Sequence, residues 1–221
     1  MRIALLGRGK TGSKVLELSA HAVEVFDRSR PATYEALKEF DVIISFLPGD
    51  AFRELIPLLL ETKRPVVTGS TGFAWPADFD RVLKEKGLAW IHATNFSLGV
   101  VVLKQLIQRL GQVSSLFPKK ELSIHEVHHT KKVDAPSGTA LSMKEWLHQD
   151  CAITSERTGD VVGLHTLTLA TPSETITLGH EAKDRGLFAE GALWAADYLV
   201  SKPLTPGLHP FQKVVETHLS L

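Results

Sequence analysis

A glycine-rich turn close to the N-terminus restricts the possible folds of this chain more than any other feature. Arg2 to Leu6 is a short apolar run of strand type, and it leads directly into Gly7-x-Gly9-x-x-Gly12. Val15 and Leu18 then follow with helical spacing. A strand, a G-x-G-x-x-G turn and a helix in this order predict a dinucleotide-binding unit, in which the helix N-terminus receives the pyrophosphate.

Strands and helices continue to alternate through the first half of the chain. Further strands are expected at 22–26, 41–47, 65–68 and 88–92, and helices at 31–40, 52–60 and 78–86. This alternation predicts βαβ units and a mostly parallel sheet.

The pattern changes character near residue 98. Helices are expected at 100–110, 139–147 and 186–199, strands at 121–129, 166–169 and 174–180, and a turn-rich segment at 203–210 before a closing helix. The predicted fold class is therefore α/β, with a Rossmann-type nucleotide-binding domain (1–98 plus 186–221) and an inserted α+β domain for the substrate (99–185).

Composition excludes several classes of protein. The 221 residues include 25 basic and 25 acidic side chains, so no bulk charge attracts nucleic acid or an anionic membrane. No apolar stretch approaches the roughly 18 residues of a membrane helix. Cys151 is the only cysteine, so no intrachain disulfide can form. We expect Cys151 to be a small, semi-buried residue and not a nucleophile. We expect a soluble, cytoplasmic protein that binds neither nucleic acid nor membrane.

Two charged residues at the end of the second strand bear on the choice of cofactor. Asp27 is suited to bind the ribose hydroxyl of NAD, whereas Arg28 beside it is suited to the 2′-phosphate of NADP. Lys10 could add a phosphate contact. We therefore predict that both NADH and NADPH are used.

The stretch from Glu126 to Thr139 is the most informative about chemistry. It contains two adjacent imidazoles, two lysines, an aspartate and a Ser-Gly-Thr turn. These groups are suited to hold and protonate a small polyanion. His128 and His129 point to opposite faces if both lie in a strand, so they can share a pocket only where the strand ends.

Two other polar segments follow strands directly. Thr68-Gly-Ser-Thr-Gly-Phe73 follows the strand at 65–68, and Asn95-Phe-Ser-Leu-Gly99 follows the strand at 88–92. Open α/β sheets bind ligands at the carboxyl ends of their strands.

Taken together, these segments resemble the 4-hydroxy-tetrahydrodipicolinate reductase family, nicotinamide-dependent reductases of bacterial lysine and diaminopimelate synthesis. The matching pieces occur in family order, and the most specific is H-H-x-x-K-x-D-A-P-S-G-T. They cover 7–12, 68–73, 95–99, 128–139, and Arg185 through Gly191-Ala192. The resemblance implies NAD(P)H-dependent reduction of 4-hydroxy-tetrahydrodipicolinate, a cyclic dicarboxylate, to tetrahydrodipicolinate. It also implies a homotetramer built through the sheet of the second domain, which the apolar stretch 161–170 would suit.

The family pattern assigns roles to individual residues. It makes His128 the catalytic acid/base and Lys132 a second proton-donating and substrate-orienting group, with His129, Gly138 and Thr139 at substrate-binding positions. The expected cofactor-binding residues are Gly7, Arg8, Gly9, Lys10, Thr11, Gly12, Asp27, Arg28, Gly69, Ser70, Thr71, Ala93, Thr94, Asn95 and Phe96.

The chain departs from the family pattern in three places. It is shorter between the second strand and the strand at 41–47, which predicts a trimmed sheet. Ser45-Phe46-Leu47 lies where the family usually has Asp-Phe-Thr, and Val101 lies where asparagine is common after Gly99-Val100. These differences concern the edge of the cofactor pocket.

Three other interpretations compete with this one. A zinc site at His125, His128 and His129 lacks the usual ligand spacing, and His125 would face away from His128, so no metal is predicted. Another Rossmann oxidoreductase of a small carboxylate would account for Gly7 to Asp27 but not for the His/Lys cluster. A non-enzymatic NAD(P)-sensing module would need no acid/base centre.

Overall fold

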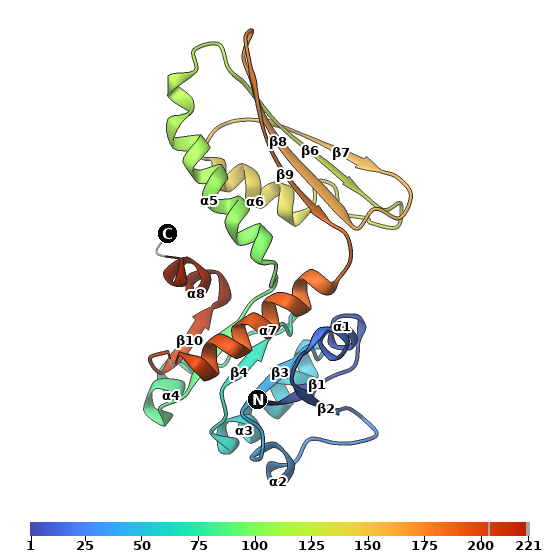
Figure 1. Cartoon of the computed structure of the whole chain (residues 1–221), viewed down its shortest axis with the longest axis vertical. Coiled ribbons are helices and arrows are strands. Elements are labelled where there is room, and N and C mark those ends of the chain that lie inside the picture. Colours follow the sequence, from blue (N-terminus) through green and yellow to red (C-terminus); the bar gives the residue numbers. More distant parts are fainter. Residues whose placement is uncertain (203, 220–221) are drawn as a thin grey trace. The chain divides into compact units, whose positions relative to one another are not determined.

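The computed structural model describes residues 1–202 and 204–219. The chain divides into two compact units, of which unit 1 comprises Met1–Ser97 with Arg185–Leu221 and unit 2 comprises Leu98–Asp184. Unit 1 holds a parallel six-stranded sheet and unit 2 a mixed four-stranded sheet (Figure 1). The predicted α/β class is confirmed. None of the helices in the described residues is both long and apolar enough to cross a membrane.

The sheet of unit 1 has the strand order β10-β5-β4-β3-β1-β2, and every pair is parallel. Its interior strands are almost continuously apolar because helices cover both faces. The strands are β1 (Arg2–Leu6), β2 (Ala22–Phe26), β3 (Val42–Ser45), β4 (Val66–Thr68), β5 (Ala89–His92) and β10 (Gly207–Pro210).

Two groups of helices enclose this sheet. On one face, α1 (Lys10–Leu18) packs on α7 (Gly186–Ser201), and α7 contacts β3 and β4. On the other face, Phe52 of α3 and Leu83 of α4 join Ile43 and Trp90 of the sheet in one apolar core. The helices of this second group are α2 (Tyr34–Leu37), α3 (Gly49–Thr62) and α4 (Phe79–Lys86), while α8 (Phe211–His218) follows β10.

Unit 2 is a two-layer α+β arrangement. The sheet has the order β7-β6-β8-β9, with β6 and β7 parallel and the other pairs antiparallel. Its core joins Ile107 of α5 and Met143 of α6 to Ile124 and Leu167 of the sheet. The elements are α5 (Leu98–Val113), the short 3₁₀ helix η1 (Ser114–Leu116), β6 (Glu121–His128), α6 (Gly138–Leu147), β7 (Ala152–Arg157), β8 (Gly163–Ala170) and β9 (Thr175–Ala182).

Three parts of the predicted secondary structure were wrong. The helix expected at 31–40 is only Tyr34–Leu37, because Thr33 caps its start and the chain turns at once towards β3. The segment at 203–210 was expected to be turns, yet Gly207–Pro210 forms an edge strand on β5; Pro203 lies outside the described residues. No strand was predicted at Ala152–Arg157, where an edge strand with mostly exposed side chains lacks apolar alternation.

Candidate active site

The glycine-rich turn of unit 1 is built by a close approach between backbones. Gly7 has a positive φ of 94°, and its N–H donates to Phe26 O of β2 at 2.9 Å. A Cβ on Gly12 would lie 2.2 Å from Gly7 O, so only glycine lets α1 begin this close to the sheet. Gly9 is the N-cap of α1, and no atom of the described residues lies within 4 Å of a hypothetical Cβ on it, which leaves its backbone open to a ligand. This geometry suits a pyrophosphate at the helix N-terminus.

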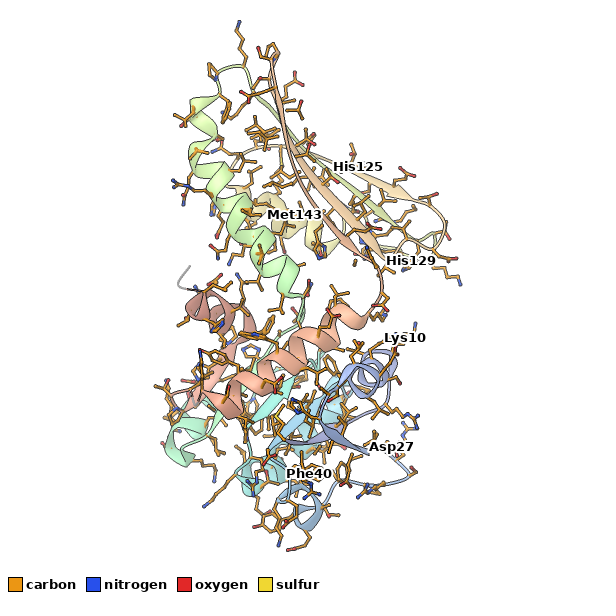
Figure 2. The ribbon with its side chains drawn as sticks, in the orientation of Figure 1. Lys10, Asp27, Phe40, His125, His129 and Met143 are labelled. Carbon is orange, nitrogen blue, oxygen red and sulfur yellow. The ribbon has the colours of Figure 1, made fainter. Side chains whose placement is uncertain are left out.

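Asp27 shapes the turn that follows β2. One of its oxygens, Oδ1, accepts hydrogen bonds from Ser29 N at 2.8 Å, from Ser29 Oγ at 2.6 Å and from Arg30 N at 3.3 Å. These bonds, led by the one from the Ser29 hydroxyl, lower the pKa of Asp27, and the positive charge of Arg8 adds to the effect. Asp27 is therefore an anionic group with an ordered carboxylate. Figure 2 labels Asp27 and also Lys10, the first residue of α1.

The segment after β4 offers its backbone more than its side chains. Gly69 N–H donates to Ser45 O, and the buried Ser70 hydroxyl lies 3.1 Å from the Ser45 hydroxyl. Thr71 beside it is exposed. The structure thus turns Ser70 inward, and Ser45 is its partner. A cofactor can meet Thr71 and the Gly69 backbone here.

The segment after β5 is held in a similar way. Ala93 N–H donates to Thr68 O at 3.1 Å, and Ser97 N–H donates to Asn95 Oδ1 at 2.8 Å. The Phe96 ring is only 1% exposed and packs on Phe46 and Phe211. Phe96 therefore supports the segment from the core, and the exposed side chain is that of Thr94.

In unit 2, the two adjacent histidines separate at the end of β6. His128 is its last residue and is buried, and its carbonyl accepts from Thr158 N–H at 2.9 Å. His129 belongs to the following loop and is half-buried (Figure 2). His125 is exposed on the other face of the sheet, where Nδ1 lies 2.9 Å from Thr154 Oγ1. The strand end predicted to be necessary for a shared His128/His129 pocket is present.

The loop after β6 places a cation close to His128. Lys132 Nζ donates to both carboxylate oxygens of Asp134 at 2.8 Å. Arg157 of β7 donates from Nη2 to Asp134 O at 2.6 Å, which fastens the loop to the sheet. Asp134 is thus a structural partner of Lys132, and a substrate carboxylate can take its place.

The N-terminus of α6 completes this end of unit 2. Ser137 is its N-cap, and the Ser137 hydroxyl accepts from Ala140 N at 3.2 Å. Gly138 and Thr139 form the first turn, where backbone N–H groups have no intrahelical acceptor. Such N–H groups at the positive end of a helix favour a carboxylate.

Two buried residues, Glu126 and His165, and the partly buried Arg157 lie behind His128, and the sequence analysis assigned none of them. The fully buried Glu126 accepts at Oε1 from Arg157 Nη2 at 2.9 Å and from Ser137 N at 3.0 Å. Its other oxygen, Oε2, lies 3.4 Å from His128 Nδ1 and 3.7 Å from His165 Nε2. His165 Nε2 is also 3.1 Å from Ser137 Oγ. Strand alternation could have indicated Glu126, which is two positions from His128, but not His165 or Arg157 on other strands.

Burial and hydrogen bonding set the charges in this cluster. Burial opposes ionisation of Glu126, but hydrogen bonds from Ser137, Arg157 and Ser155 outweigh it and lower the pKa to about 2. Burial lowers the pKa of His165 to about 4, and the nearby His128 contributes. Burial likewise lowers the pKa of His128, the Glu126 carboxylate raises it, and the charges of Lys132 and Arg157 lower it further.

Among the described residues, one group of side chains has the spacing of a metal site. Ligand atoms of Glu126, His128 and His165 all lie within 4.8 Å of one another. However, Arg157 already pairs with this carboxylate at 2.9 Å. A divalent cation here would sit beside that guanidinium, which electrostatic repulsion disfavours. The histidines considered for zinc from the sequence are not grouped, because His125 faces the other way.

Fold and site together define a class of protein, a dinucleotide-dependent oxidoreductase with a separate polar, acid/base-bearing unit. Comparisons identify the family within this class. A family model described as "Dihydrodipicolinate reductase, C-terminus" matches residues 99–215, more than half of the chain. The chain belongs to the dihydrodipicolinate reductase family, NADH- or NADPH-dependent oxidoreductases of lysine and diaminopimelate synthesis.

Individual relatives agree with the family match. A 4-hydroxy-tetrahydrodipicolinate reductase from Christiangramia forsetii is 35% identical over 91% of this chain and 93% of its own length. One from Xanthomonas euvesicatoria is 39% identical over 74% of this chain and 69% of its own. A dipicolinate-bound dihydrodipicolinate reductase structure from Paenisporosarcina sp. has a TM-score of 0.77 at 21% identity. The match covers 97% of this chain and 99% of that one. These matches confirm the resemblance drawn from the motifs and favour neither alternative class.

The lowered pKa of His165 predicts a loss of stability in mild acid. Below the ordinary pKa of 6.5 the unfolded chain binds a proton that the folded chain accepts only near 4. The free energy of unfolding should therefore fall as pH decreases through this window, by about 3 kcal/mol in all from this group. Urea unfolding of His165→Gln should show a shallower fall between about pH 7 and pH 5 than the unsubstituted protein. Equal slopes for the two proteins would contradict the buried, neutral assignment.

Proposed function

We propose that this chain reduces 4-hydroxy-tetrahydrodipicolinate to tetrahydrodipicolinate with NADH or NADPH, and that His128 and Lys132 carry the proton chemistry. The observation that carries the proposal is the buried imidazole of His128 at the end of β6, with Lys132 and the first turn of α6 beside it in sequence and in the same unit. Unit 1 is the cofactor domain in this proposal, and unit 2 is the substrate and assembly domain.

The chemistry of the reaction requires an acid. Loss of the 4-hydroxyl together with a hydrogen from the neighbouring ring carbon would release water and leave a conjugated ring. Hydride from a bound nicotinamide would then add to that ring, and the electron pair left on it must accept a proton from a positioned donor. A protonated His128 can give that proton from Nε2, and Lys132 is the second available donor.

The substrate charge suits the polar groups of unit 2. A ring dicarboxylate needs two anion sites, and the solved relative from Paenisporosarcina sp. holds dipicolinate. We assign one carboxylate to Lys132 and the other to the N–H groups of Gly138 and Thr139, with His129 as a further contact. Lys132 would exchange Asp134 for the substrate carboxylate.

Cofactor binding is assigned to the residues named from the glycine turn and the strand ends of unit 1. Gly7 to Gly12 would hold the pyrophosphate, and Asp27 with Arg28 the adenosine ribose. Gly69, Thr71 and the stretch 93–96 would lie near the nicotinamide, where Ser70 and Phe96 act through the backbone and the core.

Activity with both cofactors is the first prediction. Freshly generated 4-hydroxy-tetrahydrodipicolinate should cause loss of nicotinamide absorbance with NADH and with NADPH, because Asp27 and the exposed Arg8 and Arg28 provide for both riboses. We expect kcat/KM values within about a hundredfold, which corresponds to about 2.7 kcal/mol. No absorbance loss with either cofactor would refute the proposed function, and a larger preference would refute dual use.

Substitutions at the two proposed proton donors should have different kinetic effects. His128→Ala should lower kcat by roughly 100- to 10,000-fold with little change in KM, as expected for loss of a general acid. Lys132→Ala should also raise KM by about tenfold or more, because a charge-assisted contact to the substrate is lost. Lys131→Ala is the matched control, since that lysine is exposed and outside the proposed site. Unchanged turnover in His128→Ala would refute its role as the acid.

We also propose a homotetramer assembled through unit 2, as expected from the family. The face of the sheet opposite α5 and α6 carries Thr166, with His125 and Gly179 as cross-strand neighbours. Light scattering should give a tetramer mass for the unsubstituted protein and a smaller mass for Thr166→Glu, which places a charge in the middle of that face. A monomeric unsubstituted protein would contradict the assembly.

We place the enzyme in the cytoplasm. Burial raises the pKa of the Cys151 thiol, and the cytoplasm would keep this free cysteine reduced.

A further inference from the structure

Glu126 and His128 lie two positions apart on β6 and therefore point to the same face of the sheet. We propose that Glu126 is a positioning residue for the proton donor: it holds a proton on Nδ1 of His128 and so makes Nε2 the nitrogen that serves the substrate. This inference rests on the proposed function and adds a residue to its machinery. A buried carboxylate orients an imidazole in the same way in serine protease triads.

The carboxylate is fixed in orientation. Oε1 accepts from Arg157 Nη2 at 2.9 Å and from Ser137 N at 3.0 Å, so two groups from different elements prevent it from rotating. Oε2 is thereby directed towards the imidazoles of His128 and His165. The orientation does not depend on His128 itself.

Two buried atoms without partners then face each other. Among the described residues, Glu126 Oε2 and His128 Nδ1 are both buried and have no hydrogen-bond partner, and they lie 3.4 Å apart. Buried polar atoms in native proteins are almost always paired. A small rotation of the ring that directs a hydrogen on Nδ1 at Oε2 would satisfy both atoms at once, and the contact should shorten when the ring is charged.

The opposite edge of the ring faces a glycine. A Cβ on Gly163 of β8 would lie 3.1 Å from His128 Nε2. Glycine at this position therefore leaves room at Nε2, while Glu126 occupies the Nδ1 side. In this inference Glu126 holds the Nδ1 edge and the Nε2 edge serves the substrate, which is the arrangement that a proton donor requires.

His165 does not compete for the same role. Its Nε2 is 3.7 Å from Oε2 but only 3.1 Å from Ser137 Oγ. Its pKa of about 4 keeps His165 neutral at the pH values at which His128 would act as an acid. Other charged or titratable groups around His128 are Arg157 on β7, Lys132 and Asp134 in the loop, and His180 across β9 from His165. Of all these groups, Glu126 is the one whose charge both faces Nδ1 and favours a protonated ring.

The first test is the tautomer of His128, measured by ¹⁵N NMR on the unsubstituted full-length protein above the pKa of that ring. We expect the proton on Nδ1. Finding it on Nε2 would overturn the inference without any variant, and the result does not depend on turnover. Failure of the inference and failure of the proposed function are therefore distinguishable.

The second test is Glu126→Gln, which keeps the shape and removes the charge. We expect the proton to move to Nε2, kcat to fall by about 10- to 100-fold with KM within about threefold, and the falling limb of kcat/KM to shift to lower pH. Glu126→Asp should restore the Nδ1 tautomer in part, which a purely structural role would not predict. An unshifted pH profile and an unchanged tautomer in a folded Glu126→Gln would refute the positioning role.

A matched control lies on the other face of the same sheet. Glu156 Oε2 is 3.8 Å from His125 Nε2, so Glu156→Gln also removes a carboxylate beside a histidine. It should leave the His128 tautomer, kcat and the pH profile unchanged.

Zinc titration followed on the same ¹⁵N signals tests whether Glu126, His128 and His165 bind a metal instead. Stoichiometric binding at His128 and His165 would overturn the positioning role in favour of a metal site.

Discussion

The proposed acid site depends on the hydrogen bonds that keep the carboxylate of Glu126 ionised while it is buried inside unit 2. Removing a carboxylate from water costs several kcal/mol unless charge and hydrogen bonds compensate. Arg157, Ser137 N–H and the neighbouring hydroxyls provide that compensation, as the pKa of about 2 indicates. The same contacts connect β6, β7 and the start of α6, so the strand end, the loop and the helix N-terminus are held by one anion.

This arrangement links the stability of unit 2 to its chemistry. Arg157 donates both to Glu126 and to Asp134 O, and Asp134 in turn holds Lys132. The side chain proposed to bind a substrate carboxylate is therefore connected through one guanidinium to the carboxylate behind His128. Truncating Arg157 would leave the buried charge of Glu126 uncompensated, which typically costs 3–5 kcal/mol. Conservative replacements such as Gln for Glu are needed to separate function from folding.

Much of the fold could be predicted because most strands of unit 1 are buried and apolar. Ile3 to Leu6, Val42 to Ile44 and Val66–Val67 have little exposed surface, and such runs bounded by turn residues are strong signals. β7 and β10 were missed because their own sequences lack strand signals, whereas the other two edge strands, β2 and β9, were predicted. β7 is mostly exposed, and β10 contains Gly207 at a φ of 147° and ends in Pro210. Local patterns carry little information about strands whose pairing is decided by the rest of the sheet.

The candidate site was predictable to a different extent in its two halves. Motif residues such as Gly7, Gly12 and His128 occupy positions with evident physical demands, a close backbone approach or a strand end. The inward orientation of Ser70 and Phe96 could not be inferred, because it depends on Ser45 in one case and on Phe46 and Phe211 in the other. His165 and Arg157 reach Glu126 only through the pairing of β8 and β7 with β6. Sequence reasoning named the groups proposed to meet the substrate, and tertiary structure was needed to find the groups behind them.

The burial of His128 creates a conflict that the surrounding charges help to resolve. Burial lowers the pKa of this ring, and Lys132 and Arg157 lower it further, so the free protein favours the neutral form. A proton donor must nevertheless be charged when the hydride arrives. Glu126 supplies one opposing charge permanently, and a dicarboxylate substrate would supply two more while neutralising Lys132. Binding of the substrate would therefore raise the pKa of His128 at the moment when the acid is needed, and keep the ring uncharged inside unit 2 at other times.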